Sequence, residues 1–255
     1  MSRIDAGGVA LALVLTALAA LAWLGVARDE AMMQMDHGPP RASLAAATGF
    51  TVQWGVMMTA MMLPSAVPMI LLYRGIGRRA AGSGETVIPA WAFTLVYLIA
   101  WLATGVPVYA ASIAMGNAAA RSPAFAGSMP YVVAATLMAA GAYQLTPAKI
   151  ACLRACERPV DFLMSRWRSG KAATLRLAVS HAAYCIGCCW ALMVVLVAAG
   201  AMSLPWVLAI ALVVFAEKVM PGGGRTARFA GWALIAAGVA VAAKPELAAL
   251  LKPSG

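Results

Sequence analysis

The sequence predicts an all-α protein, a polytopic bundle of about seven membrane-spanning helices. Its 255 residues are 63% hydrophobic and 11% charged, whereas a soluble domain is about 45–50% apolar and about 25% charged. The apolar residues also gather in runs of about 20, the length with which a helix crosses a bilayer. No soluble domain remains between these runs, so we expect a single membrane domain over residues 1–255.

Seven apolar runs define the expected spans. They cover residues 7–27, 50–73, 88–115, 129–148, 177–201, 204–220 and 229–243. The first run is longer than the core of about 7–15 residues in a signal peptide, which favours an uncleaved anchor. The second contains Pro64 and Pro68, which membrane helices tolerate. The third and fourth runs are assigned from their apolar content alone. In the fifth and sixth runs, no charged residue interrupts the stretch from Leu177 to Ala216.

The basic residues predict the orientation, because Lys and Arg are retained on the cytoplasmic side. With the N-terminus inside, 14 of the 19 basic residues lie on that side. They are Arg3, Arg74, Arg78, Arg79, Lys149, Arg154, Arg158, Arg166, Arg168, Lys171, Arg176, Lys218, Arg225 and Arg228. We therefore expect an N-in/C-out inner-membrane protein, with a basic cytoplasmic loop at 149–176 and an outer loop at 28–49. The net charge of +10 then reflects topology and not nucleic-acid binding.

A histidine and three cysteines lie close together in the stretch HAAYCIGCCWALM, residues 181–193. At 100° per residue His181, Cys185 and Cys188 share one helix face, with Cys189 at its margin. None of the five cysteines falls in the expected outer loop, so we expect reduced thiols. Thiolate and imidazole suit Cu(I), with Zn(II) as the second choice. The alternative is packing, because a free cysteine behaves as a small hydrophobic residue.

Four methionines in the second run form two interleaved pairs spaced four residues apart: Met57, Met58, Met61 and Met62. Thioethers are also soft ligands. At 1.5 Å per residue these methionines lie roughly as deep from one side as Cys188 does from the other, so the two sets meet if their helices are neighbours. The alternative is core packing, for which methionine is an adaptable filler.

Two further segments are candidates for metal capture and release. The outer loop contains MMQMDHGPP, in which Met32, Met33, Met35, Asp36 and His37 form an exposed capture segment or simply a flexible loop.

On the inner side, Cys152 and Cys156 lie one helical turn apart beside several cations. Cations lower the pKa of a thiol, so these residues qualify as exchange ligands, with ordinary reduced cysteines as the alternative.

Polar residues at the same level add accessory candidates. Tyr143 and Gln144 lie late in the fourth run, and Glu217 and Lys218 close the sixth. A charged residue in a span usually pairs or serves a function. Glu217 therefore either forms an ion pair with Lys149 or is a protonatable site, whereas Lys218 reads best as an anchor at the membrane interface.

Four motifs in this order, WGVMMTAMMLPSAVP, YQLTPAKIACLRACERP, YCIGCCWALM and AEKVMPGG, resemble a bacterial family of predicted metal-binding integral membrane proteins. The resemblance covers roughly residues 50–225, without the first span, the outer loop and the last span. It implies a class and not a reaction, and we expect the whole fold to be a six-span family core plus a flanking span. The residues to which it points are Trp54, Met57, Met61, Met62, Pro64, Tyr143, Gln144, Lys149, Cys152, Cys156, Cys185, Cys188, Cys189, Trp190, Met193, Glu217 and Lys218.

Together these features predict a membrane protein that binds a soft metal ion, Cu(I) first, for transport, delivery or homeostasis. Its expected partners are the lipid bilayer and a metallochaperone or a membrane metalloprotein. The phosphate-binding loop of ATPases does not occur in the sequence, so any transport is passive or driven by an ion gradient. The alternatives are a membrane thiol or redox protein and a scaffold subunit of a membrane complex. We expect no catalytic residue.

Overall fold

The computed structural model describes residues 5–33, 43–198 and 204–250, and within these ranges it contains helices and no strand. The helices are α1 (Ala6–Met33), α2 (Leu44–Gly82), α3 (Ala90–Ala103), α4 (Gly105–Arg121), α5 (Pro123–Gln144), α6 (Pro147–Glu157), α7 (Pro159–Arg166), α8 (Lys171–Ala198), α9 (Leu204–Val219), α10 (Gly223–Ala243) and α11 (Leu247–Leu250). The predicted all-α class is confirmed.

Six helical segments of the described chain are long and apolar enough to cross a membrane. They are Ala6–Arg28, Leu44–Gly82, Ala90–Arg121, Pro123–Gln144, Lys171–Ala198 and Gly223–Ala243. The expected span at 204–220 corresponds to α9, whose 16 described residues make a helix of only about 24 Å. This is shorter than a hydrocarbon core of about 30 Å. Six of the seven expected spans are therefore matched by length and composition.

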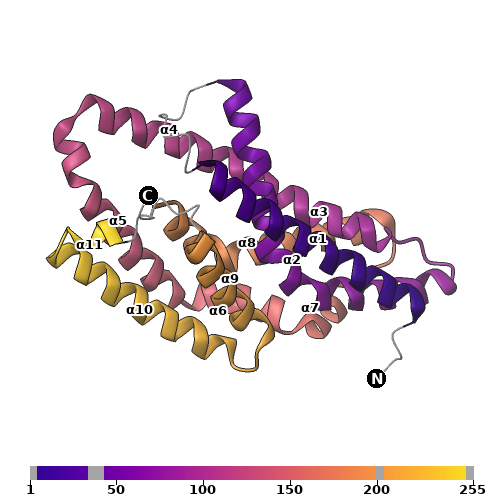
Figure 1. The fold of residues 1–255 in the computed structure, drawn as a ribbon. Coiled ribbons are helices and arrows are strands. Elements are labelled where there is room, and N and C mark those ends of the chain that lie inside the picture. Colours follow the sequence, from indigo (N-terminus) through magenta and orange to yellow (C-terminus); the bar gives the residue numbers. More distant parts are fainter. Residues whose placement is uncertain (1–4, 34–42, 199–203, 251–255) are drawn as a thin grey trace.

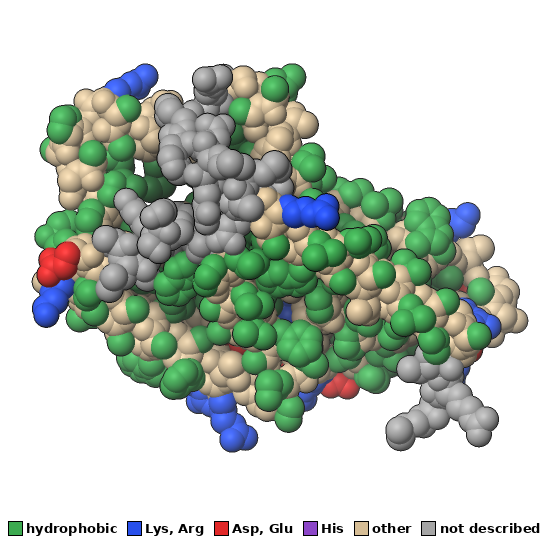
Figure 2. All heavy atoms as spheres, in the orientation of Figure 1, with side chains coloured by type: hydrophobic (Ala, Val, Ile, Leu, Met, Phe, Trp, Pro, Cys, Tyr) green, Lys and Arg blue, Asp and Glu red, His purple; other side chains and the backbone are tan. Residues whose placement is uncertain are grey.

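The surface carries many large apolar side chains. Leu13, Trp91, Leu212 and Trp232 are each more than 60% exposed. Figure 2 shows one face on which hydrophobic side chains cover broad areas, while charged side chains are few and widely spaced. Soluble monomers rarely expose apolar areas of this extent, so this surface is compatible with a membrane protein.

The helices form two side groups with α8 and α9 between them. Figure 1 shows α5 beside α10 at one end of the molecule, and α1, α2 and α3 at the other. The start of α1 lies beside the end of α2, because Asp5 pairs with Arg74 at 2.6 Å and also with Arg78. This contact places both helix ends on one side of the bundle, as the expected topology requires.

The α5–α10 contact depends on glycine. A Cβ added at Gly231 would lie 2.9 Å from the carbonyl oxygen of Gly141, and one at Gly238 would lie 2.8 Å from that of Ala134. Small residues of this kind let two membrane helices approach closely. The two helices therefore pack backbone against backbone.

Residues 149–176, which we expected to be a loop, contain most of α6 and all of α7. Pro147 begins α6, and the Thr146 side chain caps it by accepting a hydrogen bond from the backbone N–H of Lys149. The helix packs against α8 and α9 and buries Lys149 and Leu153. This segment is therefore part of the core, and it sets the position of the buried lysine.

Candidate sulfur-rich metal site

Thiols from two helices lie close together in the core. Cys185, Cys188 and Cys189 of α8 are each at most 2% exposed. The Cys188 Sγ lies 3.3 Å from the Cys189 Sγ and donates to the Cys185 carbonyl oxygen at 3.1 Å. Cys156 of α6 lies within hydrogen-bonding reach of the Cys185 and Cys188 thiols. We call these four residues the thiol cluster, and all four are free cysteines.

Side chains from three other helices, α2, α3 and α9, surround the Cys185 thiol of α8. Its Sγ lies 3.1 Å from the Tyr97 hydroxyl of α3 and 3.0 Å from the Lys218 Nζ of α9. The same Nζ lies 3.5 Å from the Met62 Sδ and 3.5 Å from the Ser65 Oγ, both on α2. Tyr97 also donates to the Met62 carbonyl oxygen at 3.3 Å. A thiol and a thioether thus share one ammonium group as a partner.

The expectation that Lys218 is an interfacial anchor is wrong, because its side chain points into the core and the residue is only 5% exposed. Tyr97 and Ser65 were not among the expected site residues. A phenol within a long apolar run was the available signal for Tyr97, whereas nothing in the sequence set Ser65 apart.

A second polar network lies beside the thiol cluster. Glu217 accepts from Lys149 Nζ at 2.6 Å and from Gln144 Nε2 at 2.7 Å, and all three residues are fully buried. Lys149 also donates to the Cys188 carbonyl oxygen, and Tyr143 donates to that of Gly187. Of the two interpretations of Glu217, the structure contains the ion pair with Lys149. These contacts fasten α6 and α9 to the segment of α8 that carries the cysteines.

His181 lies one helical turn before Cys185 and is 3% exposed. The rings of Phe93, Tyr97 and Phe162 lie within 6.0 Å of its ring, measured between centroids. Neither ring nitrogen has a hydrogen-bond partner among the described residues. A buried polar atom without a partner is costly, and both nitrogens of this ring, one helical turn from Cys185, have none among the described residues.

The four methionines of α2 are all buried, at most 3% exposed. Within the described chain, Met62 is the one whose sulfur shares a partner with Cys185. Met57, Met58 and Met61 belong to the hydrophobic core around it. One methionine sulfur and one cysteine sulfur from the two expected sets therefore contact the same ammonium group.

The expected lowering of the pKa of Cys152 and Cys156 is not found, because the causes that raise these pKa values outweigh the effect of the neighbouring cations. The hydrogen bond with Cys185 raises the pKa of the Cys156 thiol well above its usual value. Burial raises the pKa of the Cys152 thiol, and the Lys149 ammonium offsets only part of this rise. The Cys152 Sγ packs against Gly187, where an added Cβ would lie 3.0 Å from the sulfur.

The expected capture segment falls mostly outside the described part of the chain. Met35, Asp36 and His37 lie outside the described residues, and of Met32 and Met33 only the helical backbone of α1 is described. The capture role therefore stays a prediction.

No group of three or more His, Cys, Asp or Glu side chains within the described ranges is arranged to hold a metal ion. The Cys185 sulfur instead contacts protein groups, namely the Tyr97 hydroxyl and the Lys218 ammonium. A soft metal ion would have to take the place of such contacts. The donors themselves, thiols with one thioether and one imidazole, are the set that suits Cu(I).

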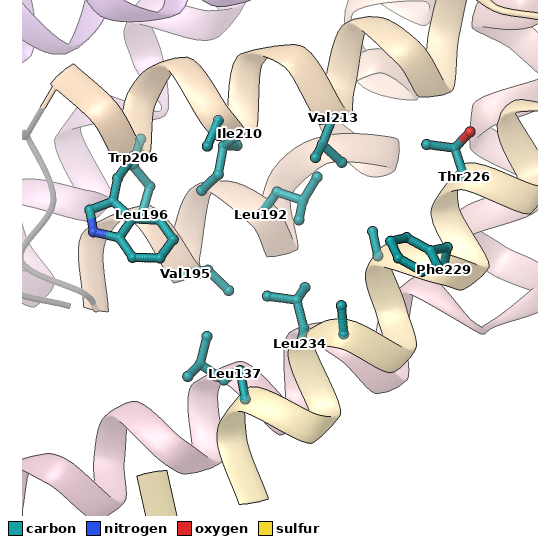
Figure 3. Close-up of a pocket in the computed structure, with 14 residues that line it drawn as sticks. Leu137, Leu192, Val195, Leu196, Trp206, Ile210, Val213, Thr226, Phe229 and Leu234 are labelled. Atoms are coloured by element: carbon teal, nitrogen blue, oxygen red, sulfur yellow. The ribbon is translucent and has the colours of Figure 1, made fainter. Parts of the chain in front are cut away.

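An apolar cavity of about 260 Å³ lies apart from these donors, between α8, α9 and the α5–α10 pair. Leu192, Trp206, Phe229 and Leu234 are among its lining residues, and Figure 3 shows their side chains around the open space. Its lining includes no sulfur, acid or base. The cavity therefore takes no part in the candidate metal site.

Comparison with known protein families gives a match over residues 51–241 to the model of the PpoB2 family, described as copper chaperone. The matched region covers most of the chain and includes the thiol cluster, the α2 methionines, Lys149 and Lys218. No curated protein and no solved structure matches the chain. The metal-related class that the sequence motifs implied is thus supported, and the family description is consistent with copper.

Proposed function

Because the chain belongs to the PpoB2 copper chaperone family, we propose that it is an integral membrane protein that binds Cu(I) at the thiol cluster and delivers it to a partner metalloprotein. One observation carries the proposal: the sulfur atoms of Cys185 on α8 and Met62 on α2 both contact the Lys218 ammonium group, from two different helices. A thiolate and a thioether are soft ligands, which favour Cu(I) over the harder divalent ions.

Cys185 and Met62 are the first ligands in this proposal, and Cys188 and Cys189 supply further sulfur. Their burial supports the assignment, since a site closed to water protects a thiophilic ion from exchange with solvent ligands. The phenol of Tyr97 holds both ligands in place, because it contacts the Cys185 Sγ and the Met62 carbonyl oxygen.

Transfer to the partner uses His181 and Cys156. His181 lies one turn nearer the start of α8 than Cys185, and its two nitrogens have no partner among the described residues. Cys156 connects the thiol cluster to α6, on which Cys152 lies one turn away. Copper moves along these donors by ligand exchange, which changes neither the oxidation state of copper nor that of sulfur.

The experiment is elemental analysis of the full chain, purified in detergent and treated with Cu(I) under reducing conditions. We expect about one copper per chain in the wild type and loss of that copper when Cys185, Cys188 and Cys189 are all replaced by Ser. Ala183→Ser is the matched control, because it places the same side chain on the exposed face of α8. Equal copper in the triple variant and the wild type, or none in the wild type, would reject the proposal.

The same preparation separates the copper chaperone from a thiol redox protein. A redox protein would show disulfide formation and its reversal in thiol labelling, with no copper bound in the reduced state. A chaperone retains copper only while its thiols are reduced.

A further inference from the structure

The described core contains two buried ammonium groups and one buried carboxylate. Lys149 and Lys218 are at most 5% exposed, and Glu217 is the buried acid. Both oxygens of that carboxylate are engaged away from Lys218, since Oε1 accepts from Gln144 and Oε2 from Lys149. The Lys218 charge therefore lies in the core without a carboxylate partner in the described chain.

Two sulfur atoms, and no carboxylate of the described chain, contact the Lys218 ammonium group. The Lys218 Nζ lies 3.0 Å from the Cys185 Sγ and 3.5 Å from the Met62 Sδ. A buried charge is costly unless it is paired, and these two sulfurs are partners of this monovalent cation. The Nζ also occupies the place from which one ion would contact both sulfurs.

We propose that Lys218 is an internal monovalent cation that fills the sulfur site in the metal-free protein, and that Cu(I) exchanges with its ammonium group. This inference rests on the proposed function. The exchange breaks the hydrogen bonds from Nζ to sulfur and forms contacts from Cu(I) to the same sulfurs. Cu(I) binds Cys185 as a thiolate, so a thiol proton at that sulfur passes to the solvent buffer. The Lys218 ammonium moves aside and keeps its charge, and copper and sulfur keep their oxidation states.

The displaced ammonium has a second acceptor within reach. The Ser65 Oγ lies 3.5 Å from Nζ and one helical turn beyond Met62 on α2. A small rotation of the lysine side chain toward Ser65 opens the space between the two sulfurs. The return of the ammonium competes with copper and so promotes release to the partner, as delivery requires.

The test compares Cu(I) affinities of the full chain in detergent, measured by competition with the chromogenic chelator bicinchoninate. We expect Lys218→Gln to bind Cu(I) about 10-fold to 100-fold more tightly, the range that corresponds to losing one competing charge-assisted hydrogen bond. Lys171→Gln is the matched control, because it removes the same charge from the exposed start of α8. Equal or weaker binding by Lys218→Gln would overturn the inference.

A second variant decides the matter where Lys218→Gln does not fold. Ser65→Ala removes the acceptor for the displaced ammonium, and we expect Cu(I) binding about 2-fold to 10-fold weaker, the value of one ordinary hydrogen bond. Unchanged or tighter binding would contradict the exchange. A wild type that binds no Cu(I) rejects the proposed function itself, whereas a wild type that binds and variants that do not respond reject the exchange alone.

Discussion

The buried ion pair between Lys149 and Glu217 gives the sharpest stability prediction. Glu217→Gln keeps the shape of the side chain but leaves the Lys149 ammonium without an anionic partner in the core. Both residues are fully buried and the two groups lie 2.6 Å apart. Breaking a buried pair in this way costs about 3–5 kcal/mol. A change of 1 kcal/mol shifts Tm by about 2–4 °C in a chain of this size, so we expect Tm to fall by about 6–20 °C.

The assay follows the fluorescence of a thiol-reactive dye during heating, because the buried cysteines become accessible when the core opens. The double variant Lys149→Met with Glu217→Gln removes both charges, and we expect it to recover at least half of the lost Tm, since replacing a whole buried pair is often neutral. Asp161→Asn is the control, because the Arg158–Asp161 pair is exposed and 4.0 Å apart. A Glu217→Gln variant within 2 °C of the wild type, or a double variant less stable than the single one, would refute this reasoning; the 2 °C limit is about the effect of 1 kcal/mol or less.

Three further outcomes are expected. Gly231→Ala places a Cβ 2.9 Å from the Gly141 carbonyl oxygen and lowers stability by about 1–3 kcal/mol, whereas Gly116→Ala, with open space around it, does not lower it; equal Tm values would contradict the close α5–α10 contact. His181→Phe replaces a buried imidazole that has no hydrogen-bond partner among the described residues by an apolar ring, and stabilises the fold by about 1–3 kcal/mol. A lower Tm would mean that the imidazole has a partner. Burial raises the pKa of Cys152, so at pH 8 this residue holds less thiolate than a free cysteine, and its alkylation rate rises at a higher pH. Peptide mass spectrometry after timed labelling at several pH values measures this rate. The prediction is contradicted if the pH at which the rate reaches half its maximum is at or below that of a free thiol.

The features that follow from local periodicity were predictable from the sequence. Runs of about 20 apolar residues predicted the helical class, and six such segments occur in the described chain. The 100° spacing placed His181, Cys185 and Cys188 on one face of a helix, and all three are buried. The charge of Glu217 in an apolar run pointed to a partner, and Lys149 is that partner.

Contacts between helices were not predictable in this way, because periodicity shows which face of a helix is buried but not which helix covers it. Cys156 approaches Cys185 because α6 packs against α8. This packing could not be predicted, because the segment that forms α6 was interpreted as a basic loop. The inward direction of Lys218 was missed because a lysine at the end of an apolar run usually reaches the interface. Here the sulfur of Cys185 and Met62 replaces water as its partner.

Glu217 and Lys218 are neighbours in sequence, yet each contacts a different group of residues. Glu217 joins α9 to Gln144 of α5 and Lys149 of α6, and Lys218 joins it to α2 and α8. Adjacent side chains leave a helix about 100° apart and turn with it as one body. Any rotation of this short helix about its axis thus alters both sets of contacts at once, so the charge pair and the proposed copper ligands respond to one movement.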